Sequence, residues 1–495
     1  MKVAFVTPEI DPLVRRTPLA EVAAALPKAL AESGADARVF LPFTQSVALD
    51  KLTSLKALGS VSAQDTDGRT SFQIHSGLLG AVPVYLFGHP QFFEGRQPYG
   101  GDEGPYDDNW RRYAVFARAV LESLATLEFE AEVIHCFDWA TGILPVLHEL
   151  EFVQRRPEHP ASRAGTYFQI HNIAIQGTFE REVLPRLGLP YRVFQAVGGV
   201  ELAGKVNFLK AGAEFATIIG THSPGHAERI QQLDRGYGLE DVFRRRSKEL
   251  IGIASGIDYN TWDPATDTVL VKGYSHKDKT LAGKVKCKAA LQTTLKLEPG
   301  ARTPLAVMLG RFDADSGCEI LAEVLTTALE RGVECVLMGS GRPDIHERLK
   351  TIQTTFFGRC RVLEGYQLSL AHQIIAAADV LLLPAHYHPG NALCAIGMRY
   401  GAVPLVYAGG GLEDYVLDAQ KNPRNGTGFH FSSYTGESLL DGLENARKLY
   451  KSQDAWRQIV LRCMKQDFSW AATAQEYLKA YRRVTRRTKP RSESA

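Results

Sequence analysis

The chain has 495 residues, 45% hydrophobic and 23% charged, with 57 lysines and arginines against 55 aspartates and glutamates. This length favours two or more domains, each large enough to bury its own core. A formal net charge of +2 argues against a protein that coats nucleic acid or an anionic membrane, because one sign of charge would then dominate. The first residues, MKVAFVTPEIDP, lack a signal peptide's apolar stretch, and no apolar run approaches the roughly 18 residues that span a bilayer. We therefore expect a cytoplasmic protein with several domains that contacts neither nucleic acid nor membrane.

The seven cysteines are scattered singly, without a CxxC pair. This spacing suits neither a disulfide framework nor a zinc site, so we expect reduced, buried thiols. No cluster with metal-ligand spacing is visible either. We therefore predict that the protein holds no metal and no cofactor.

The first half of the chain predicts alternating strands and helices. The strands are continuous apolar runs, and the helices show helical spacing of apolar residues. Continuous apolar strands separated by helices are typical of a parallel sheet covered on both faces. Strands are expected at 3–8, 37–43, 132–139, 166–172 and 216–223, and helices at 19–34 and 140–150.

The same alternation restarts after about residue 300, which predicts a second α/β domain. Between the halves lies a polar segment, residues 263–284, which we interpret as the domain junction. The expected architecture is two doubly wound, Rossmann-like α/β domains with a cleft between them. We assign residues 1–258 and 259–467 to the domains, 468–486 to a helix that packs back on the first domain, and 487–495 to a polar tail. Strands of the second half are expected at 304–312, 334–341, 360–366, 379–385 and 403–409, and helices at 320–332 and 370–378.

Several polar residues follow directly after predicted strands. Asp138 and His171 follow two strands of the first half, and Arg311 follows the first strand of the second half. Open α/β sheets build their ligand sites at the carboxyl ends of their strands. Each residue also has a structural interpretation, because the histidine could bond a turn, Asp138 could cap a helix starting at Ala140, and Arg311 could form a surface ion pair.

A run of three glycines, Gly409, Gly410 and Gly411, lies between a predicted strand and a helix expected near Leu412. Backbone N–H groups at such a turn can approach an anion closely, and a helix N-terminus favours phosphate. Glycine-rich turns also occur for steric reasons alone. The acids Glu413 and Asp414 compete for the same helix end.

The order and spacing of these pieces resemble one family. The chain is similar to the bacterial glycogen synthases and plant starch synthases of glycosyltransferase family 5, from residue 1 to about residue 486. These are retaining glucosyltransferases with the GT-B fold, in which two Rossmann-like domains face each other across a cleft, and they transfer glucose from ADP-glucose to α-1,4-glucan. The segments that carry the resemblance include MKVAFVTPEIDPL, YDDNWRRYAVFARAVLE, VIHCFDWATGILPV, IHNIAIQGTFEREVLPRLGLP, SGIDYNTWDPATD, EGYQLSLAHQIIAAADVLLLPA and QDFSWAATAQEYLKAYRRV.

The resemblance implies a role for each candidate site residue. By it, His171 would bond the donor glucose, and Asp138 would contact hydroxyls on the acceptor side. Arg311 would neutralise the donor phosphates, Tyr366 would stack near the adenine, and the loop at Gly409, Gly410 and Gly411 would meet phosphate through backbone amides. The partners would be a nucleotide sugar and an α-glucan, and oligomers are possible. Glu9, Tyr106 and Asn207 lie in similar segments without an assigned role.

Three stretches depart from the family's pattern on the donor side. Where the family has Lys-Thr-Gly-Gly-Leu, this chain has Arg15-Arg16-Thr17-Pro18-Leu19, so that Pro18 lacks a backbone N–H. Ser316 stands where the family has a lysine five residues after its phosphate-binding arginine. His388 stands in place of the glutamate that faces the donor glucose, and an imidazole cannot replace a carboxylate there.

Three hypotheses follow. The first is a glucan synthase-like glycosyltransferase whose donor use is impaired or altered, with Arg15, Arg16 and His388 rebuilding the site for another nucleotide sugar. The second is a catalytically inactive glucan-binding or regulatory homologue. The third is a homo-oligomeric scaffold without a ligand, against which the retained His171, Asp138 and Arg311 count.

Overall fold

The computed structural model describes residues 1–233, 235–298, 303–386, 392–409, 411–413 and 415–488. The chain forms two compact units. Unit 1 contains residues 1–254 and the C-terminal segment from Trp470, and unit 2 contains residues 255–469. The polar segment 263–284, which we interpreted as the junction, lies inside unit 2 instead. None of the helices in the described ranges is long and apolar enough to cross a membrane.

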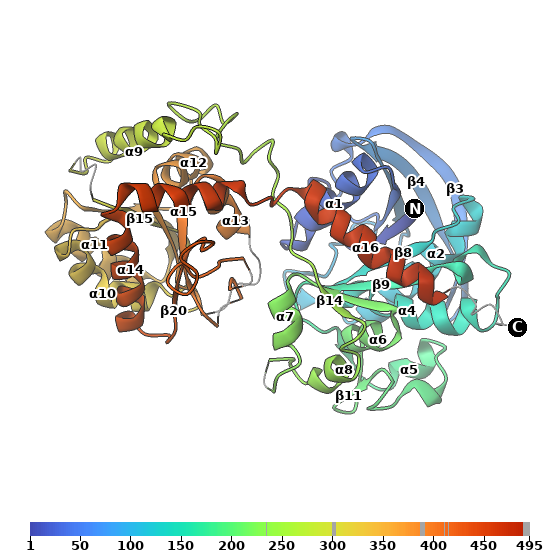
Figure 1. The fold of residues 1–495 in the computed structure, drawn as a ribbon. Helices are drawn as coiled ribbons and strands as arrows, with labels where there is room; N and C mark the ends of the chain where they lie inside the picture. The colour runs from blue at the N-terminus through green and yellow to red at the C-terminus, as the bar shows by residue number, and fades with distance from the viewer. Residues whose placement is uncertain (234, 299–302, 387–391, 410, 414, 489–495) are drawn as a thin grey trace, which may run out of the picture. The chain divides into compact units, whose positions relative to one another are not determined.

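Unit 1 is built on a nine-stranded sheet with the order β14-β13-β9-β8-β1-β2-β5-β4-β3. All neighbours from β14 to β5 are parallel, although β14 and β5 themselves were not predicted, whereas β5, β4 and β3 form an antiparallel edge. That hairpin, at Thr53–Asp65 and Gly68–Leu79, was not predicted (Figure 1). The other strands are β1 Lys2–Val6, β2 Asp36–Pro42, β5 Val82–Gly88, β8 Val133–Phe137, β9 Gly165–Ile170, β13 Ile218–Thr221 and β14 Leu250–Gly252.

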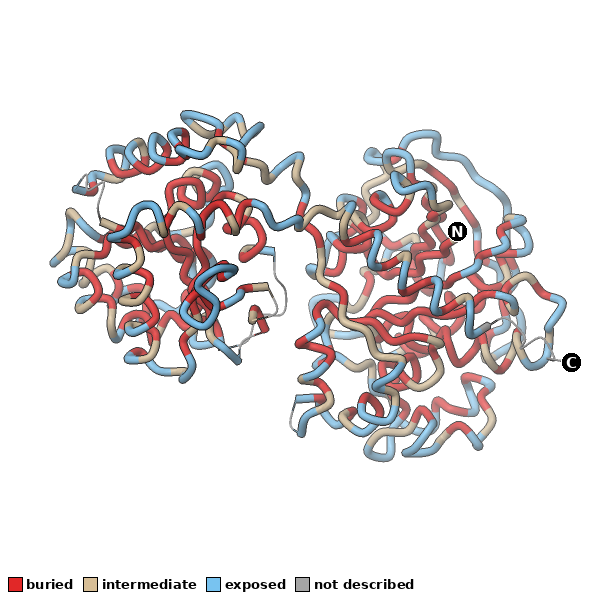
Figure 2. The backbone as a smooth tube through the Cα atoms, viewed as in Figure 1, coloured by how far each residue is buried: buried red, intermediate tan, exposed pale blue. Residues whose placement is uncertain are grey.

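Helices cover both faces of this sheet, because alternate residues of its strands belong to two separate cores. Val3 and Phe5 of β1 pack on the side of α1 and α16, and Ala4 and Val6 pack on the side of α2, α4 and α6. Figure 2 shows the buried residues gathered along the strands in the interior. These helices are α1 Leu19–Glu32, α2 Asn109–Thr126, α4 Leu144–Leu147, α6 Phe208–Phe215 and α16 Trp470–Thr488. The shorter helices are α3 Asp138–Thr141, α5 Val183–Arg186, α7 Pro224–Arg229 and α8 Glu240–Arg245.

The C-terminal helix α16 is part of unit 1. It lies along α1 (Figure 1), and its side chains Tyr477 and Tyr481 are fully buried. The Tyr481 hydroxyl and the Nδ1 atom of His135 on β8 form a hydrogen bond of 2.6 Å. His135 is thus a core residue bound to α16.

Unit 2 is a six-stranded, all-parallel sheet with the order β17-β16-β15-β18-β19-β20. The strands are β15 Leu305–Phe312, β16 Glu334–Gly341, β17 Cys360–Glu364, β18 Val380–Leu383, β19 Val403–Tyr407 and β20 Phe429–Phe431. The helices are α9 Ala282–Thr294, α10 Cys318–Glu330, α11 Pro343–Thr355, α12 Leu368–Ala377, α13 Ala392–Arg399, α14 Gly436–Tyr450 and α15 Gln453–Lys465.

Segment 263–284 is fixed to unit 2 by polar contacts that are distant in sequence. Asp267 accepts hydrogen bonds of 2.6 Å from the Tyr400 hydroxyl and 2.7 Å from His372 Nδ1. Asp263 pairs with Arg399 at 2.6 Å. These contacts explain why a segment with few large apolar residues still packs on a domain.

Lys284 at the end of this segment gives a prediction for unit 2. Its side chain is buried, its ammonium donates to the carbonyls of Ala376 and Tyr400 at 3.1 and 3.0 Å, and burial lowers its pKa to about 8. The unfolded chain therefore binds the proton more tightly, so this group's contribution to stability rises with pH between about 8 and 10.5. In Lys284→Met, where Tyr274 still donates to both carbonyls, we expect this rise to disappear. The difference between the two unfolding curves should change by about 2–3 kcal/mol between pH 7 and pH 10.

Candidate active site

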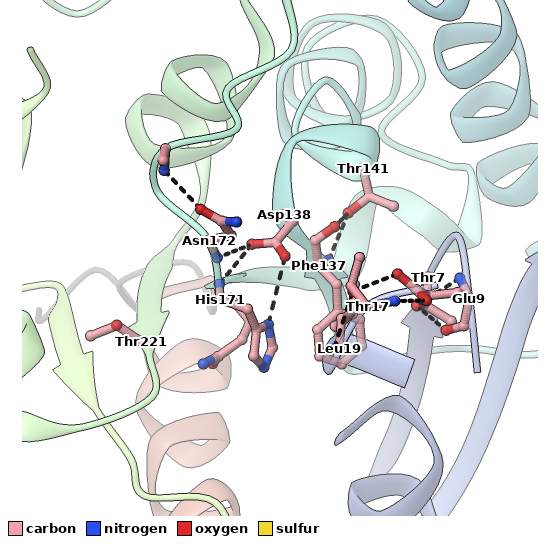
Figure 3. Close-up of polar contacts among 12 residues, drawn as sticks. Thr7, Glu9, Thr17, Leu19, Phe137, Asp138, Thr141, His171, Asn172 and Thr221 are labelled. Atoms are coloured by element: carbon pink, nitrogen blue, oxygen red, sulfur yellow. Dashed lines mark hydrogen bonds and ion pairs between the residues drawn. The ribbon is translucent and has the colours of Figure 1, made fainter. Parts of the chain in front are cut away.

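Polar residues after β1, β8 and β9 lie at the carboxyl edge of the unit 1 sheet, where the strand order reverses between β1 and β8. Asp138 follows β8 and His171 follows β9. Asp138 Oδ1 accepts the backbone N–H of His171 at 2.6 Å and that of Asn172 at 3.2 Å, and its Oδ2 lies 4.0 Å from His171 Nδ1 (Figure 3). The fold thus brings together the two first-half residues that the sequence singled out.

Asp138 is held in an unfavourable state. Its φ angle of +53° is rare for a residue with a side chain. Burial raises the pKa of its carboxyl to about 7, although the two backbone N–H groups oppose the shift; the nearby carboxylate of Glu9 adds to the rise. Helix α3 begins at Asp138 itself, and the carboxylate reaches across to the next strand end instead of capping the helix. Strain and a shifted pKa in one residue are typical of a functional site.

His171 carries a neutral imidazole. Burial, and secondarily the neighbouring His222, lowers its pKa to about 3. Both ring nitrogens are buried, and within the described ranges neither has a hydrogen-bond partner. A neutral imidazole offers one donor and one acceptor, which matches a sugar hydroxyl.

Glu9 organises the loop between β1 and α1, residues 7–18, which we call the first loop. The carboxylate is fully buried and accepts the backbone N–H groups of Arg16 at 2.6 Å and Thr17 at 2.9 Å. It also accepts the hydroxyls of Thr17 and Tyr99, both at 2.7 Å. The sequence assigned Glu9 no role; its one signal is an acid directly after a buried strand, next to a loop rich in donors.

The start of helix α1 is satisfied within the chain. The Thr17 hydroxyl accepts the N–H of Leu19 at 3.2 Å, and the Thr17 carbonyl accepts that of Ala20 at 3.2 Å. Pro18 has no N–H. From Arg16 to Ala20, every backbone N–H is therefore bonded to Glu9 or Thr17, and none is directed to a ligand.

Arg15, one of the two arginines of this loop, is paired with acids of its own unit. Its guanidinium pairs with Glu21 and lies 3.8 Å from Asp11, and its side chain is 59% exposed. Arg16 donates to the side-chain oxygen of Gln97. Exposed pairs of this kind are weak and can rearrange.

In unit 2, Arg311 and Ser316 are brought together by Asp313. Arg311 lies near the carboxyl end of β15, at the point where the strand order reverses toward β18. Its Nε donates to Asp313 Oδ2 at 2.7 Å, and its side chain is 84% exposed. The Ser316 hydroxyl donates to the Asp313 carbonyl at 2.8 Å, and the Ser316 N–H donates to Asp313 Oδ1 at 2.9 Å. Ser316 therefore closes a local turn and offers no cation.

The glycine loop differs from the prediction. No helix begins near Leu412 in the described residues; a single turn is closed by the N–H of Val416 and the carbonyl of Leu412 at 3.1 Å. The N–H of Gly411, at φ +97°, donates to Glu413 at 2.7 Å. Gly409 packs against the ring of Tyr407, and Gly410 lies outside the described residues.

The two remaining predicted residues are Tyr366 and His388. Tyr366 follows β17 and is 55% exposed, whereas His388 lies outside the described residues.

The sequence missed an aromatic group at this edge of unit 2. The Tyr434 ring contacts those of His386 and Tyr407 at centroid distances of 4.7 and 5.3 Å, and its hydroxyl donates to the Ala314 carbonyl. Over the ranges that the structure covers, no group of metal-ligating side chains occurs.

Comparisons with known proteins agree along nearly the full chain. The starch synthase catalytic domain family matches residues 2–245. Glycogen synthase of Geotalea uraniireducens is 36% identical over 482 residues, 97% of this chain and 98% of the relative. That of Anaeromyxobacter sp. Fw109-5 is 36% identical over 486 residues, 97% and 99% of the two chains. The solved catalytic domain of starch synthase IV from Arabidopsis thaliana, bound to ADP and acarbose, superposes with a TM-score of 0.80 at 31% identity, covering 98% of this chain and 99% of that one.

Two α/β sheets with parallel cores and polar strand ends, together with this structural match, define a glycosyltransferase of the GT-B fold class. Within that class, the chain belongs to the glycogen and starch synthase family, glycosyltransferase family 5.

Proposed function

We propose that the protein lengthens α-1,4-glucan chains with glucose from a nucleotide-glucose donor, ADP-glucose by its family, and that its use of this donor is impaired or altered. Family membership over nearly the whole chain supports the reaction. The paired Asp138 and His171 support the sugar-binding side, because a neutral imidazole and a buried carboxyl can bond the hydroxyls of glucose.

Retaining transfer through an oxocarbenium-like state depends strongly on stabilising the departing nucleotide diphosphate. In this proposal His171 bonds the donor glucose and Asp138 bonds hydroxyls on the acceptor side. Arg15 and Arg311 meet the donor phosphates, Tyr366 stacks near the adenine, and the glycines at 409–411 supply backbone amides. His388 stands on the glucose side.

One observation carries the altered donor use: the N–H groups of Arg16 and Thr17 both donate to the buried Glu9. To serve a phosphate, these amides would have to leave a buried carboxylate that would keep only the hydroxyls of Thr17 and Tyr99, and Pro18 adds no amide in their place. The backbone amides of the first loop are therefore bonded within the loop, at the positions where the family pattern implies glycines.

The donor-side groups of unit 2 support the same conclusion. Arg311 is paired with Asp313, and the N–H of Gly411 is bonded to Glu413. Each acid must be displaced or tolerated by a diphosphate, and like charges at such distances repel. Ser316 supplies no second cation to offset them.

A catalytically inactive glucan-binding or regulatory homologue is the second candidate function, and the self-bonded first loop also favours it. Both candidates are expected to bind glucan, but only the first is expected to turn over a donor. Measuring turnover and glucan binding together therefore separates them.

The test follows release of nucleoside diphosphate from ADP-glucose, then UDP-glucose, with glycogen as acceptor. The glycogen synthase of Geotalea uraniireducens serves as the active reference, and Asp138→Ala of this chain as the background. We expect turnover about 10²–10³-fold below the reference, from two weakened transition-state contacts. Turnover at the reference rate would refute impaired donor use. Turnover no higher than in Asp138→Ala, with glycogen still pulled down, would favour the inactive homologue.

We also place the protein in the cytoplasm. The seven cysteines all lie in the described ranges, and all are buried and unpaired. Buried free thiols suit a reducing compartment.

A further inference from the structure

A second loop, residues 89–106, connects β5 to α2 and contacts the first loop. We call it the tyrosine loop. Helix α2 holds this loop through its backbone. Arg112 is fully buried and donates to the carbonyls of Phe92, Gln97 and Pro98 at 2.7, 2.9 and 3.0 Å. A guanidinium presents its donors in one rigid plane, so three carbonyls that it binds at once are fixed relative to each other.

Asn109, one turn before Arg112 on helix α2, binds both Arg112 and the backbone of Tyr99. Its Oδ1 accepts from Arg112 at 2.6 Å, and its Nδ2 donates to the carbonyl of Tyr99 at 2.8 Å. The hydroxyl of Tyr113, on the next residue of the helix, donates to the Pro98 carbonyl at 2.7 Å. Three side chains of one helix turn thus fix four backbone carbonyls of the tyrosine loop.

Two side chains of the tyrosine loop reach the first loop. The Tyr99 hydroxyl donates to Glu9 Oε1 at 2.7 Å, and Gln97 accepts from Arg16. The ring of Tyr99 also contacts that of Trp139, the residue after Asp138, at a centroid distance of 6.0 Å. The tyrosine loop therefore contacts the first loop directly and also the residue that follows Asp138.

We propose that Asn109, Arg112 and Tyr113 are positioning residues: they fix the tyrosine loop so that Tyr99 holds Glu9 and, through Glu9, the conformation of the first loop. The order of transmission is α2, tyrosine loop, Tyr99, Glu9, first loop. This assigns a role to the YDDNWRRY motif, whose Tyr113 also contacts the Trp139 ring at a centroid distance of 5.4 Å. The inference rests on the proposed function only where it concerns the donor, since the coupling itself is a property of the fold.

Amide hydrogen exchange of the full-length protein tests the order of transmission. Asn109→Ala removes the bond to Tyr99 and one acceptor of Arg112, so exchange should become about tenfold faster in both 92–99 and 9–19. Tyr99→Phe removes only the bond to Glu9, so exchange should become faster in 9–19 and stay unchanged in 92–99. Tyr191→Phe is the matched control, because Tyr191 lies in the same unit, is 64% exposed and contacts Arg181 rather than either loop.

Each other pattern overturns the inference, except faster exchange throughout unit 1, which calls for a milder variant. If Asn109→Ala quickens exchange in 92–99 but not in 9–19, the loops are not coupled. If Tyr99→Phe changes both segments or neither, the order is wrong. If Asn109→Ala quickens exchange throughout unit 1, Asn109→Asp replaces it. This isosteric change keeps an acceptor for Arg112, now as a charged pair with its guanidinium, and replaces the donor to Tyr99 with an acceptor oxygen, so the same two outcomes decide.

A kinetic readout separates positioning from general stability wherever transfer can be measured. With Tyr99→Phe we expect the KM for nucleotide-glucose to change at least fivefold more than the KM for glycogen, because the first loop is assigned to the donor. Equal changes in both constants would contradict a role through the first loop. Absence of transfer would bear on the proposed function alone, because the exchange measurements need no activity.

Discussion

Asp138→Asn is expected to raise the free energy of unfolding by about 2–4 kcal/mol at pH 8 and to leave it nearly unchanged at pH 4. Burial raises the carboxyl pKa in the folded protein to about 7, from an ordinary value of 3.8. Between these values the folded chain binds the proton and the unfolded chain does not, so this group's contribution to stability falls as pH rises from about 4 to about 7. Asparagine keeps an oxygen for the N–H groups of His171 and Asn172 but carries no charge.

Denaturant unfolding of both proteins at several pH values between 4 and 8 measures this effect. Asp241→Asn is the control for an exposed carboxylate, since that side chain is 89% exposed. A flat difference for Asp138→Asn across the same range would show that Asp138 is ionised throughout. Stability gained by removing a site residue is what a strained functional position predicts.

Most of the parallel core of both sheets could be predicted because its strands are continuous apolar runs, whereas β5, β14 and β20 were not predicted. The β3–β4 hairpin was missed because its first strand is largely exposed. Residues 53–60 of β3 are all exposed, and the strand is paired with β4 at the edge of the sheet. Segment 263–284 was misplaced for a related reason. Its attachment depends on Asp267 reaching His372 and Tyr400, more than a hundred residues away, and no local pattern reports such a contact.

The candidate site was predictable to the extent that it depends on strand ends. Asp138 and His171 each follow an apolar strand, and adjacent parallel strands bring such residues together. The role of Glu9 was not predictable, because it depends on how the first loop folds back on its own amides. The helix expected near Leu412 was wrong for a different reason: glycine permits a helix start, but the carboxylate of Glu413 accepts the N–H of Gly411 instead.

Restoring the donor-side residues of the family is expected to give the largest change in activity. The variant combines Thr17→Gly and Pro18→Gly with Ser316→Lys and His388→Glu. The first pair removes the Thr17 hydroxyl from Glu9 and Leu19 and returns an N–H at position 18. Ser316→Lys adds a cation five residues after Arg311, next to Asp313. Release of ADP from ADP-glucose with glycogen should rise about 10²–10³-fold over the unmodified chain.

Partial variants show which side limits transfer. Because groups that bind one transition state act together, Ser316→Lys alone or the loop pair alone should give far less than a proportional share of the gain. Ser316→Ala is the matched control: it removes the same hydroxyl bond to the Asp313 carbonyl without adding a charge, and should leave transfer unchanged. If the full combination folds, binds glycogen and still transfers no faster than the unmodified chain, the donor-side substitutions do not limit the reaction. The self-bonded first loop is then a neutral variation of the family's site.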